Sequence, residues 1–467
     1  MTLRVLHYAD VENAYDDADG IGRLVGLIDE LRDEETIVCG SGDNTGPGVL
    51  SVVTEGRQAL DFFEAVNPVA DTFGNHDFDH GPDQLVDIVG DSPFTWVCAN
   101  AYRNGERFAT SAGAEPWIVV EAGNARVGII GTAHPETVDI NPYAGDVQFI
   151  DPIAAVKEGI EALDERAVDR IVVLSHLGDD TDLAQVVDVD VILGGHDHDR
   201  LVDRVNDTLV CRPGGNGRFV LEVSFTGKRP RATHHPVEAG PLDDDVAETL
   251  QGRAESAGLT EVVGFADSPV PCDIMASKQG ESRLGNLVTD ALRWKVDADV
   301  SIYACGGFRR RPPFEEEVTA FDLVGVIPFN RNVVVLRVDG ETLTDIFRQL
   351  ALAQFEDAPH WFFGHVSGAE LVWDDAANEL QSAHVSGSPV DPTETYNVTT
   401  TEFLVENDTL FPAFGEGDVV DMDGLVYETL VEYVREVGID PTLEGRIKRP
   451  TLTPDTIPER DWPFSPE

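Results

Sequence analysis

The sequence predicts an α/β domain in its first half and a smaller α+β domain in its second half. In the first half, short runs rich in β-branched residues alternate with amphipathic segments of helical period, which is typical of a layered α/β domain. In the second half, the order of predicted strands and helices changes, which indicates a separate unit. With 467 residues, of which 42% are hydrophobic, the chain is long enough for two domains that each bury a core.

Short apolar runs bounded by Gly, Asp or Asn predict the strands of the first domain. These runs are residues 3–8, 35–40, 68–73, 94–100, 125–131, 170–175 and 189–195. Helical patterns at 21–34 and 152–165 lie between them. We expect this domain to span residues 1–232.

An acidic amphipathic segment follows at 241–258, with Asp243 or Asp244 as its helix cap, and we assign 233–275 to a helical linker. Residues 276–450 are expected to form the second domain, and the Pro-rich end, 451–467, an irregular tail. The predicted elements of the second domain are helices at 285–296 and 341–355 and strands at 332–338 and 396–404.

The charge of the chain is unusual: 33 Lys+Arg face 86 Asp+Glu, for a net charge of −53. In molar salt the Debye length falls to about 3 Å, which screens the self-repulsion of such a surface. Because the acids are spread along the whole chain, we expect a halophilic protein rather than a sink for basic partners. The same balance argues against a nucleic-acid footprint.

The five cysteines are odd in number and scattered, so we expect neither a disulfide framework nor a thiolate metal cage. No apolar run approaches the roughly 18 residues of a membrane span. The first predicted strand begins within a few residues of Met1, which leaves no room for a signal peptide. We therefore expect a soluble, cytoplasmic protein; the pattern gives no indication of its oligomeric state.

Polar residues follow five predicted strands of the first domain, and strand carboxyl ends in open α/β sheets meet at one edge. In isolation, Asp43 is as well explained as a helix cap, and His176 as a packed imidazole. Five such groups in register favour instead a pair of divalent metals bound by carboxylate, carboxamide and imidazole ligands. The residues are Asp10 and Glu12, Asp43, Asn75 and His76, His176, and His196 and His198.

Two sets of motifs carry a resemblance to known families. GD at 42–43, GNHDFDHG at 74–81, SHLG at 175–178 and GGHDH at 194–198 resemble the motif series of the calcineurin-like metallophosphoesterases. ESRLGNLVTDAL at 281–292, CGGFR at 305–309, IPFN at 327–330 and TTEFL at 400–404 resemble the carboxyl-terminal domain of the 5′-nucleotidase / UDP-sugar hydrolase family. The resemblance implies a four-layer metallophosphoesterase-type β-sandwich flanked by helices, followed by an α+β substrate-recognition domain.

The resemblance also implies roles for the residues of the first domain. Asp43 would bridge two metals; His76, oriented by Asp79, would face the substrate. Asp10 and His198 would complete one metal site; Asn75, His176 and His196 would complete the other.

The family has Asp-x-His after its first strand, where this chain has Asp10-Val11-Glu12. We hypothesise that Glu12 is a ligand and shifts the preference of its site from zinc toward manganese or magnesium, manganese being our first choice and iron a further alternative. In the alternative, Glu12 turns away and a water takes its place.

In the second domain, the resemblance implies that Phe329 and Phe403 stack on a base and that Arg283 and Arg309 contact the phosphate or ribose side of the substrate. Without the resemblance, both rings are equally well explained as core. Two positions depart from the family: Ala304 replaces an Asn, and Thr409 replaces the ribose-binding Asp, although Asp408 could take its place. These changes suggest an altered substrate selectivity.

We therefore expect a dinuclear-metal phosphohydrolase of nucleotide catabolism that acts on nucleoside 5′-monophosphates, small molecules being its only expected partners. A second interpretation keeps the site but changes the substrate to nucleotide sugars, cyclic nucleotides or other small phosphoesters. A third is a degenerate sensor that binds metal or nucleotide without turnover.

Overall fold

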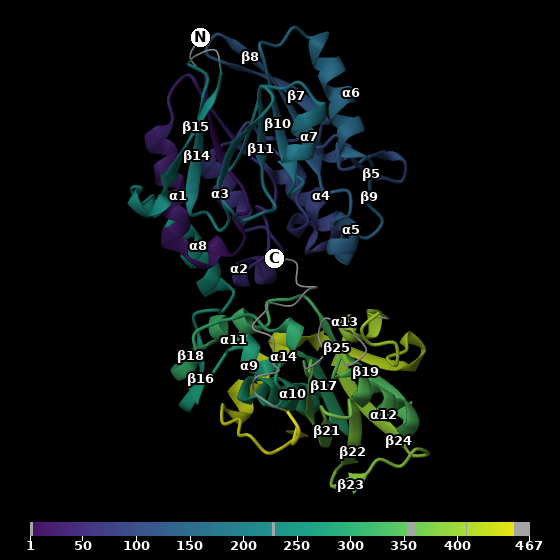
Figure 1. Cartoon of the computed structure of the whole chain (residues 1–467). Helices are drawn as coiled ribbons and strands as arrows, with labels where there is room; N and C mark the ends of the chain where they lie inside the picture. Colours follow the sequence, from purple (N-terminus) through teal and green to yellow (C-terminus); the bar gives the residue numbers. More distant parts are fainter. Residues whose placement is uncertain (1–2, 227–228, 353–360, 408, 453–467) are drawn as a thin grey trace. The chain divides into compact units, whose positions relative to one another are not determined.

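The computed structural model describes residues 3–226, 229–352, 361–407 and 409–452, which form two compact units divided between Ala257 and Gly258 (Figure 1). The division falls inside the predicted linker, 233–275. The first part of that segment belongs to unit 1, because β15 (Arg231–Pro236) pairs with a strand there and α8 (Asp244–Ser256) packs on α1 (Ala18–Leu31). The domain limits given above stay predictions, and most of the predicted tail lies outside the described residues.

Two six-stranded sheets pack face to face in the described part of unit 1. The first has the order β15, β14 (Phe219–Ser224), β1 (Arg4–Tyr8), β2 (Thr36–Gly40), β3 (Ala70–Asp71), β4 (Thr95–Trp96). The second has the order β12 (Leu201–Val205), β13 (Thr208–Arg212), β11 (Val191–Gly194), β10 (Arg170–His176), β8 (Ala125–Ala133), β7 (Trp117–Ala122). Apolar residues such as Val5, Ile37 and Ile129 alternate along the strands and form a single buried core between the sheets.

Helices cover the outer faces of both sheets (Figure 1). On the first sheet these are α1 and α3 (Ala59–Val66); α8, whose N-cap is Asp243 as predicted, packs on these two helices. On the second they are α6 (Pro152–Asp164) and α7 (Asp180–Val186), which bury Val156 and Leu183 against the sheet. The predicted four-layer sandwich is therefore confirmed. Shorter elements complete the unit: α2 (Val49–Thr54), α4 (Gly81–Asp91), α5 (Thr137–Ile140), β5 (Ala101–Arg103), β6 (Glu106–Arg107) and β9 (Gln148–Phe149).

Parallel pairing places the functional loops. Strands β1, β2, β3 and β4 are parallel neighbours, and so are β8, β10, β11 and β13. Because parallel strands end at the same edge of a sheet, the loops that follow β1, β2, β3, β10 and β11 gather at one end of the sandwich.

Unit 2 is an α+β unit. Its larger sheet has the order β20 (Gly364–Ser367), β17 (Val300–Ala304), β24 (Thr395–Thr401), β19 (Asn332–Asp339), β25 (Val419–Leu425). A second sheet joins β23 (Ser388–Pro389), β22 (Glu379–Val385), β21 (Ala369–Asp374) and β26 (Ile447–Lys448), and β16 (Val262–Val270) pairs with β18 (Phe314–Thr319). The helices are α9 (Ile274–Ser277), α10 (Arg283–Val296), α11 (Ala320–Val326), α12 (Gly340–Gln349), α13 (Glu402–Glu406) and α14 (Val426–Val437).

One predicted strand is too long. Residues 396–404 were expected to be extended, but β24 ends at Thr401 and Phe403 lies on the short helix α13. The apolar period of this segment continues past the strand end because Leu404 and Val405 are buried by the helix instead.

All five cysteines are buried, and none forms a disulfide. Of the described helices, none is both long and apolar enough to cross a membrane.

Candidate active site

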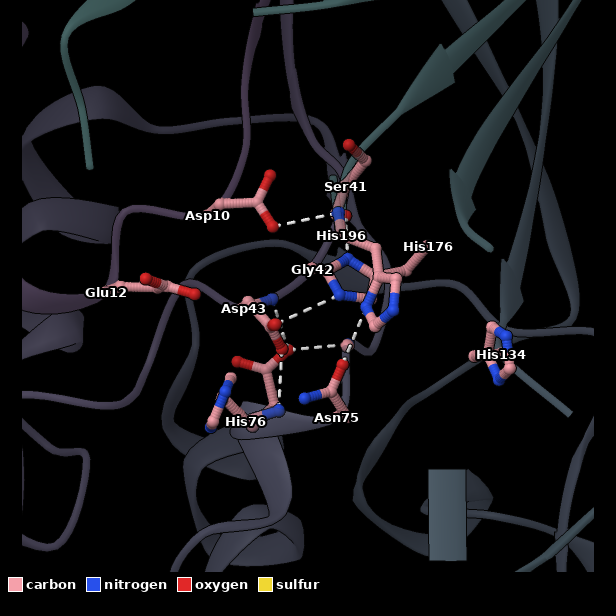
Figure 2. Close-up of polar contacts among 12 residues, drawn as sticks. Asp10, Glu12, Ser41, Gly42, Asp43, Asn75, His76, His134, His176 and His196 are labelled. Carbon is pink, nitrogen blue, oxygen red and sulfur yellow. Dashed lines mark hydrogen bonds and ion pairs between the residues drawn. The ribbon is translucent and has the colours of Figure 1, made fainter. Parts of the chain in front are cut away.

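The loops at the carboxyl ends of five strands bring the residues of the predicted metal site together, and Figure 2 labels all of them except His198. Asp10 and Glu12 follow β1, Asp43 follows β2, and Asn75 follows β3. The second sheet contributes His176, the last residue of β10, and the loop after β11, which carries His196 and His198.

The first group of potential ligands is Asp43, His176 and His196, whose donor atoms lie within 4.8 Å of one another. Nε2 of His176 lies 3.0 Å from Oδ2 of Asp43, and Nδ1 of His176 is fixed by the Ser41 carbonyl at 2.7 Å. Nδ1 of His196 lies 2.9 Å from Oδ1 of Asn75, which adds a carboxamide to this group.

The second group is Asp10, Glu12 and His198, with donor atoms within the same 4.8 Å limit. Nε2 of His198 lies 3.0 Å from Oε1 of Glu12 and 4.0 Å from Oδ1 of Asp10. Glu12 is buried, with 4% of its surface exposed, so its carboxylate faces the site rather than solvent. Its orientation agrees with the hypothesis that Glu12 takes the position of the usual histidine.

Four of these residues have left-handed backbone conformations: φ is 50° at Asp10, 47° at Glu12, 54° at Asp43 and 73° at His196. Positive φ is uncommon outside glycine and costs about 1 kcal/mol or more per residue. The surrounding contacts stabilise it: the N–H of Asp10 donates to the Gly42 carbonyl (3.0 Å), and that of His196 donates to Oδ1 of Asp10 (2.9 Å). The fold thus accepts backbone strain to direct these side chains inward.

The electrostatics of the site fit a cation. Burial raises the pKa of Asp10 well above its usual range, because an ionised carboxylate loses its hydration there. Burial alone would also raise the pKa of Asp43, but the neighbouring His176 holds that pKa below its usual range. Oδ2 of Asp10 is buried without a hydrogen-bond partner among the described residues, and Nε2 of His176 approaches Asp43 without hydrogen-bond geometry. Metal ions would satisfy both atoms, so these residues fit the divalent metals that the motifs imply.

The predicted catalytic pair adjoins this cluster. The N–H of His76 donates to Oδ1 of Asp43 (2.7 Å), and Nδ1 of His76 lies 3.1 Å from both carboxylate oxygens of Asp79. Burial alone would lower the pKa of His76, but Asp79 beside it raises that pKa to about 10. The half-buried imidazole is therefore a proton donor held in a fixed orientation.

Several supporting residues were not predicted from the sequence. Nδ2 of Asn141 donates to Oδ1 of Asp79 (2.8 Å) and to the Asn75 carbonyl (2.8 Å). The buried carboxylate of Asp77 accepts from the backbone N–H groups of Asp43 (2.9 Å), Asn44, Thr45 and Gly74, and so joins the loops after β2 and β3. Asp77 could have been recognised within GNHD, whereas Asn141 lies far away in the chain and carries no local signal.

A further histidine stacks on the site. The ring of His134 lies 5.4 Å from that of His196 at an interplanar angle of 24°, and its Nδ1 accepts from the N–H of Glu136 (3.1 Å). His134 follows β8, so it comes from a sixth strand end. The strand-end rule that located the predicted metal ligands therefore also locates His134, which stacks on one of them.

In unit 2, two of the predicted substrate residues are in contact: the Arg309 guanidinium lies 4.4 Å from the centre of the Phe329 ring. Phe403 has a similar partner that was not predicted, Arg331, at 5.8 Å. Tyr303 lies close to both arginines; burial raises its pKa more than their charges lower it. A cationic and aromatic cluster is therefore present where the motifs predicted a base-binding site.

The structure also places the two positions that depart from the family motifs, Ala304 and Thr409, and the second predicted substrate arginine, Arg283. Ala304 is buried at the end of β17 and Thr409 is exposed, while Asp408 lies outside the described residues. Nε of Arg283 donates to the Pro441 carbonyl (2.6 Å), Nη1 to the Pro269 carbonyl (2.6 Å) and Nη2 to Oγ of Ser268 (3.0 Å). Because each nitrogen of Arg283 already has a partner within the protein, these contacts give it a structural role, and its predicted contact with substrate stays a prediction.

Comparison with known proteins agrees with both halves of the chain. Residues 3–200 match the calcineurin-like phosphoesterase family, and residues 262–416 match the 5′-nucleotidase C-terminal domain. Two Bacillus subtilis proteins are similar: the trifunctional nucleotide phosphoesterase protein YfkN is 24% identical over 96% of this chain, and the endonuclease YhcR is 25% identical over 96%. The chain spans only 35% and 41% of the length of these two relatives.

Among solved structures, a 5′-nucleotidase precursor from Thermus thermophilus is 25% identical, with a TM-score of 0.69 over 96% of this chain and 99% of that one. A putative 5′-nucleotidase from Staphylococcus aureus, 18% identical, has the same fold with a TM-score of 0.70 over 96% and 100% of the two chains. The chain therefore combines a domain similar to the calcineurin-like phosphoesterases with a following domain similar to the 5′-nucleotidase C-terminal domain.

Proposed function

We propose that this phosphoesterase hydrolyses phosphomonoesters at a dinuclear metal centre, with nucleoside 5′-monophosphates as its main substrates. The observation that carries the proposal is the position of Asp43 beside His176 and His196 on one side and Glu12 and His76 on the other. A carboxylate with potential ligands on both sides is positioned to hold both ions of a divalent pair. When bound, such a pair would activate a water and neutralise the phosphate oxygens.

Each side chain then has a role. Asp43 would hold both ions; Asp10, Glu12 and His198 would hold one, and Asn75, His176 and His196 the other. His76 would donate a hydrogen bond or a proton to the oxygen that leaves phosphorus, and Asp79 would keep the imidazole in the required orientation.

The ligand sets differ in chemistry, and this supports manganese for at least one site. The group of Asp10, Glu12 and His198 offers two carboxylates and one imidazole. Oxygen-rich sets of this kind suit manganese or magnesium, whereas sets with two imidazoles suit zinc or iron as well. Glu12 is thus the residue that we propose sets the metal preference.

The choice of substrate rests on unit 2. Arginine forks fit phosphate groups, and aromatic rings stack on bases, so the cluster of Arg309, Arg331, Phe329 and Phe403 supports a nucleotide. The names of two similar proteins, a nucleotide phosphoesterase and a 5′-nucleotidase, point the same way. The exposed Thr409 in place of an aspartate favours a second candidate, a looser phosphoesterase that also accepts nucleotide sugars, cyclic nucleotides or simple esters.

A substrate panel tests the proposal. The protein is incubated in high salt with Mn²⁺ and AMP, UMP, UDP-glucose, a cyclic nucleotide or p-nitrophenyl phosphate, and released phosphate is measured, after treatment with an added phosphatase for the diesters. Preferential release from AMP and UMP supports the nucleotidase. Release from UDP-glucose, the cyclic nucleotide or p-nitrophenyl phosphate that equals or exceeds release from AMP and UMP supports the looser esterase. No release from any compound supports a sensor without turnover. His76→Asn serves as the matched inactive control.

A further inference from the structure

A buried arginine lies directly behind the candidate metal ligands. Arg212 is the last residue of β13 and exposes 7% of its surface. Its Nη1 donates to the Gly178 carbonyl (2.7 Å) and to Oδ2 of Asp197, and its Nη2 lies 3.0 Å from Oδ1 of Asp199. One guanidinium thus binds three oxygen atoms from two different loops.

In the loop after β11, candidate metal ligands alternate with aspartates that bind Arg212. The sequence of this loop is His196-Asp197-His198-Asp199. The two histidines belong to the two ligand groups, and the two aspartates bind Arg212. Each aspartate adjoins a ligand histidine in the chain, so binding of Asp197 and Asp199 to Arg212 restricts the directions that the two imidazoles can take.

The third oxygen bound by Arg212, the Gly178 carbonyl, belongs to the neighbouring loop after β10. Gly178 lies two residues after His176, in the loop that follows β10. The two loops touch there: a Cβ at Gly178 would lie 3.0 Å from Cδ2 of His196 and 3.3 Å from Oδ1 of Asp197. Arg212 therefore connects the loops that supply three of the imidazoles in the cluster.

We propose that Arg212 is a positioning residue of the metal centre, which holds His176, His196 and His198 in the geometry that binds two ions. The inference rests on the metal centre of the proposed function. Residues that orient metal ligands from behind typically change metal affinity by about 10- to 100-fold when they are replaced.

The direction in which cation affinity changes when Arg212 is replaced distinguishes a positioning role from a purely electrostatic one. Removal of a positive charge near a cation site should, by electrostatics alone, make the cation bind more tightly. Loss of positioning should make it bind more weakly. Arg212→Gln therefore gives opposite results for the two roles, and Arg212→Lys keeps the charge while it loses the planar fork.

The experiment measures Mn²⁺ binding to the full chain after removal of metals with a chelator, by isothermal titration calorimetry in high salt. We expect the wild type to bind two ions, and both Arg212 variants to bind at least one of them about 10-fold more weakly. Arg170→Gln is the matched control, because Arg170 pairs with Asp190 (2.9 Å) at the opposite end of β10; it should lower the melting temperature without weakening Mn²⁺ binding.

Equal or tighter binding by Arg212→Lys and Arg212→Gln would overturn the inference and leave the metal centre intact. If Arg212→Gln does not fold, as judged by circular dichroism, the result for Arg212→Lys decides alone. If the wild type binds no ion, the proposed function and the inference both fail. Failure of the inference alone differs from this result, because the wild type then still binds its ions.

Discussion

At the scale of single residues, a series of side-chain contacts from His76 to Asp79 and from Asp79 to Asn141 fixes the orientation of the proposed proton donor. His76 and Asp79 lie three residues apart, so a short helical turn brings them together. Asn141 comes from a distant loop and binds both Asp79 and the backbone carbonyl of Asn75. It therefore couples the orientation of the proton donor to the position of a candidate metal ligand.

We predict that Asn141→Ala lowers kcat for p-nitrophenyl phosphate by about 10- to 100-fold with little change in KM, because Asp79 loses the donor that orients it. His76→Asn should lower kcat further, by about 10²- to 10⁴-fold. Steady-state kinetics of the two single variants and the double variant tests this. If Asn141 acts through His76, its replacement has no further effect in the His76→Asn background; additive losses would contradict the coupling.

A second prediction concerns Glu12. Replacement of Glu12 by His restores two imidazoles at that site, so the ratio of bound zinc to manganese should rise by about tenfold or more. The metal content is measured by mass spectrometry after dialysis of the metal-free protein against equal concentrations of both ions. Glu12→Gln is the control that removes the charge without adding an imidazole. An unchanged ratio in Glu12→His would show that this carboxylate does not ligate.

At the scale of elements, the sequence predicts which polar residues gather at one edge, because strand ends are local information and parallel strands end on the same side of a sheet. Once the apolar runs are recognised as parallel strands, Asp43, His176 and His196 must meet at one edge. The contacts of Arg212 and Arg331 depend on which distant loops pack together, and no local pattern encodes that. The backbone carbonyls of Pro269 and Pro441, which accept from Arg283, are likewise far from it in the chain, so the motif around Arg283 does not reveal these contacts.

The packing of α10 on β20 gives a third prediction. A Cβ at Gly285 of α10 would lie 2.6 Å from Cε1 of His365, a fully buried residue of β20. Gly285→Ala should therefore lower the free energy of unfolding by about 1–3 kcal/mol, measured by urea denaturation. Gly252→Ala in α8 is the matched control, because nothing lies within 4 Å of its Cβ and alanine favours the helix. Equal stability of Gly285→Ala and the wild type would contradict this close packing.

His365 also makes stability depend on pH. Burial, aided by the charge of Arg446, lowers the pKa of His365 to about 4. As the pH falls from about 6.5 to about 4, the unfolded chain takes up a proton that the folded chain excludes, so stability decreases by up to about 3 kcal/mol. His365→Gln should remove this part of the slope of unfolding free energy against pH, provided that the variant folds. A slope identical to the wild type would show that His365 does not titrate in this range.

At the scale of the whole molecule, the net charge of −53 makes stability depend on salt, because the acidic groups repel one another. We predict that the melting temperature rises with KCl, and that most of the rise occurs between about 0.1 M and about 1 M, where the Debye length falls from about 10 Å to about 3 Å. Circular dichroism measures the transition, and sucrose at the same osmolality is the control for effects other than screening. An equal rise in sucrose would assign the stabilisation to solvent exclusion instead of charge.

The buried cysteines have a practical consequence. Burial raises the pKa of every one of these thiols, to about 11 for Cys272 and about 12 for Cys305, so almost no reactive thiolate exists near neutral pH. An alkylating reagent can then modify a cysteine only after its surroundings open. Cys39, Cys98 and Cys211 lie in unit 1, and Cys272 and Cys305 lie in unit 2. The alkylation rates of these two sets would therefore report the transient opening of each unit separately, without any introduced label.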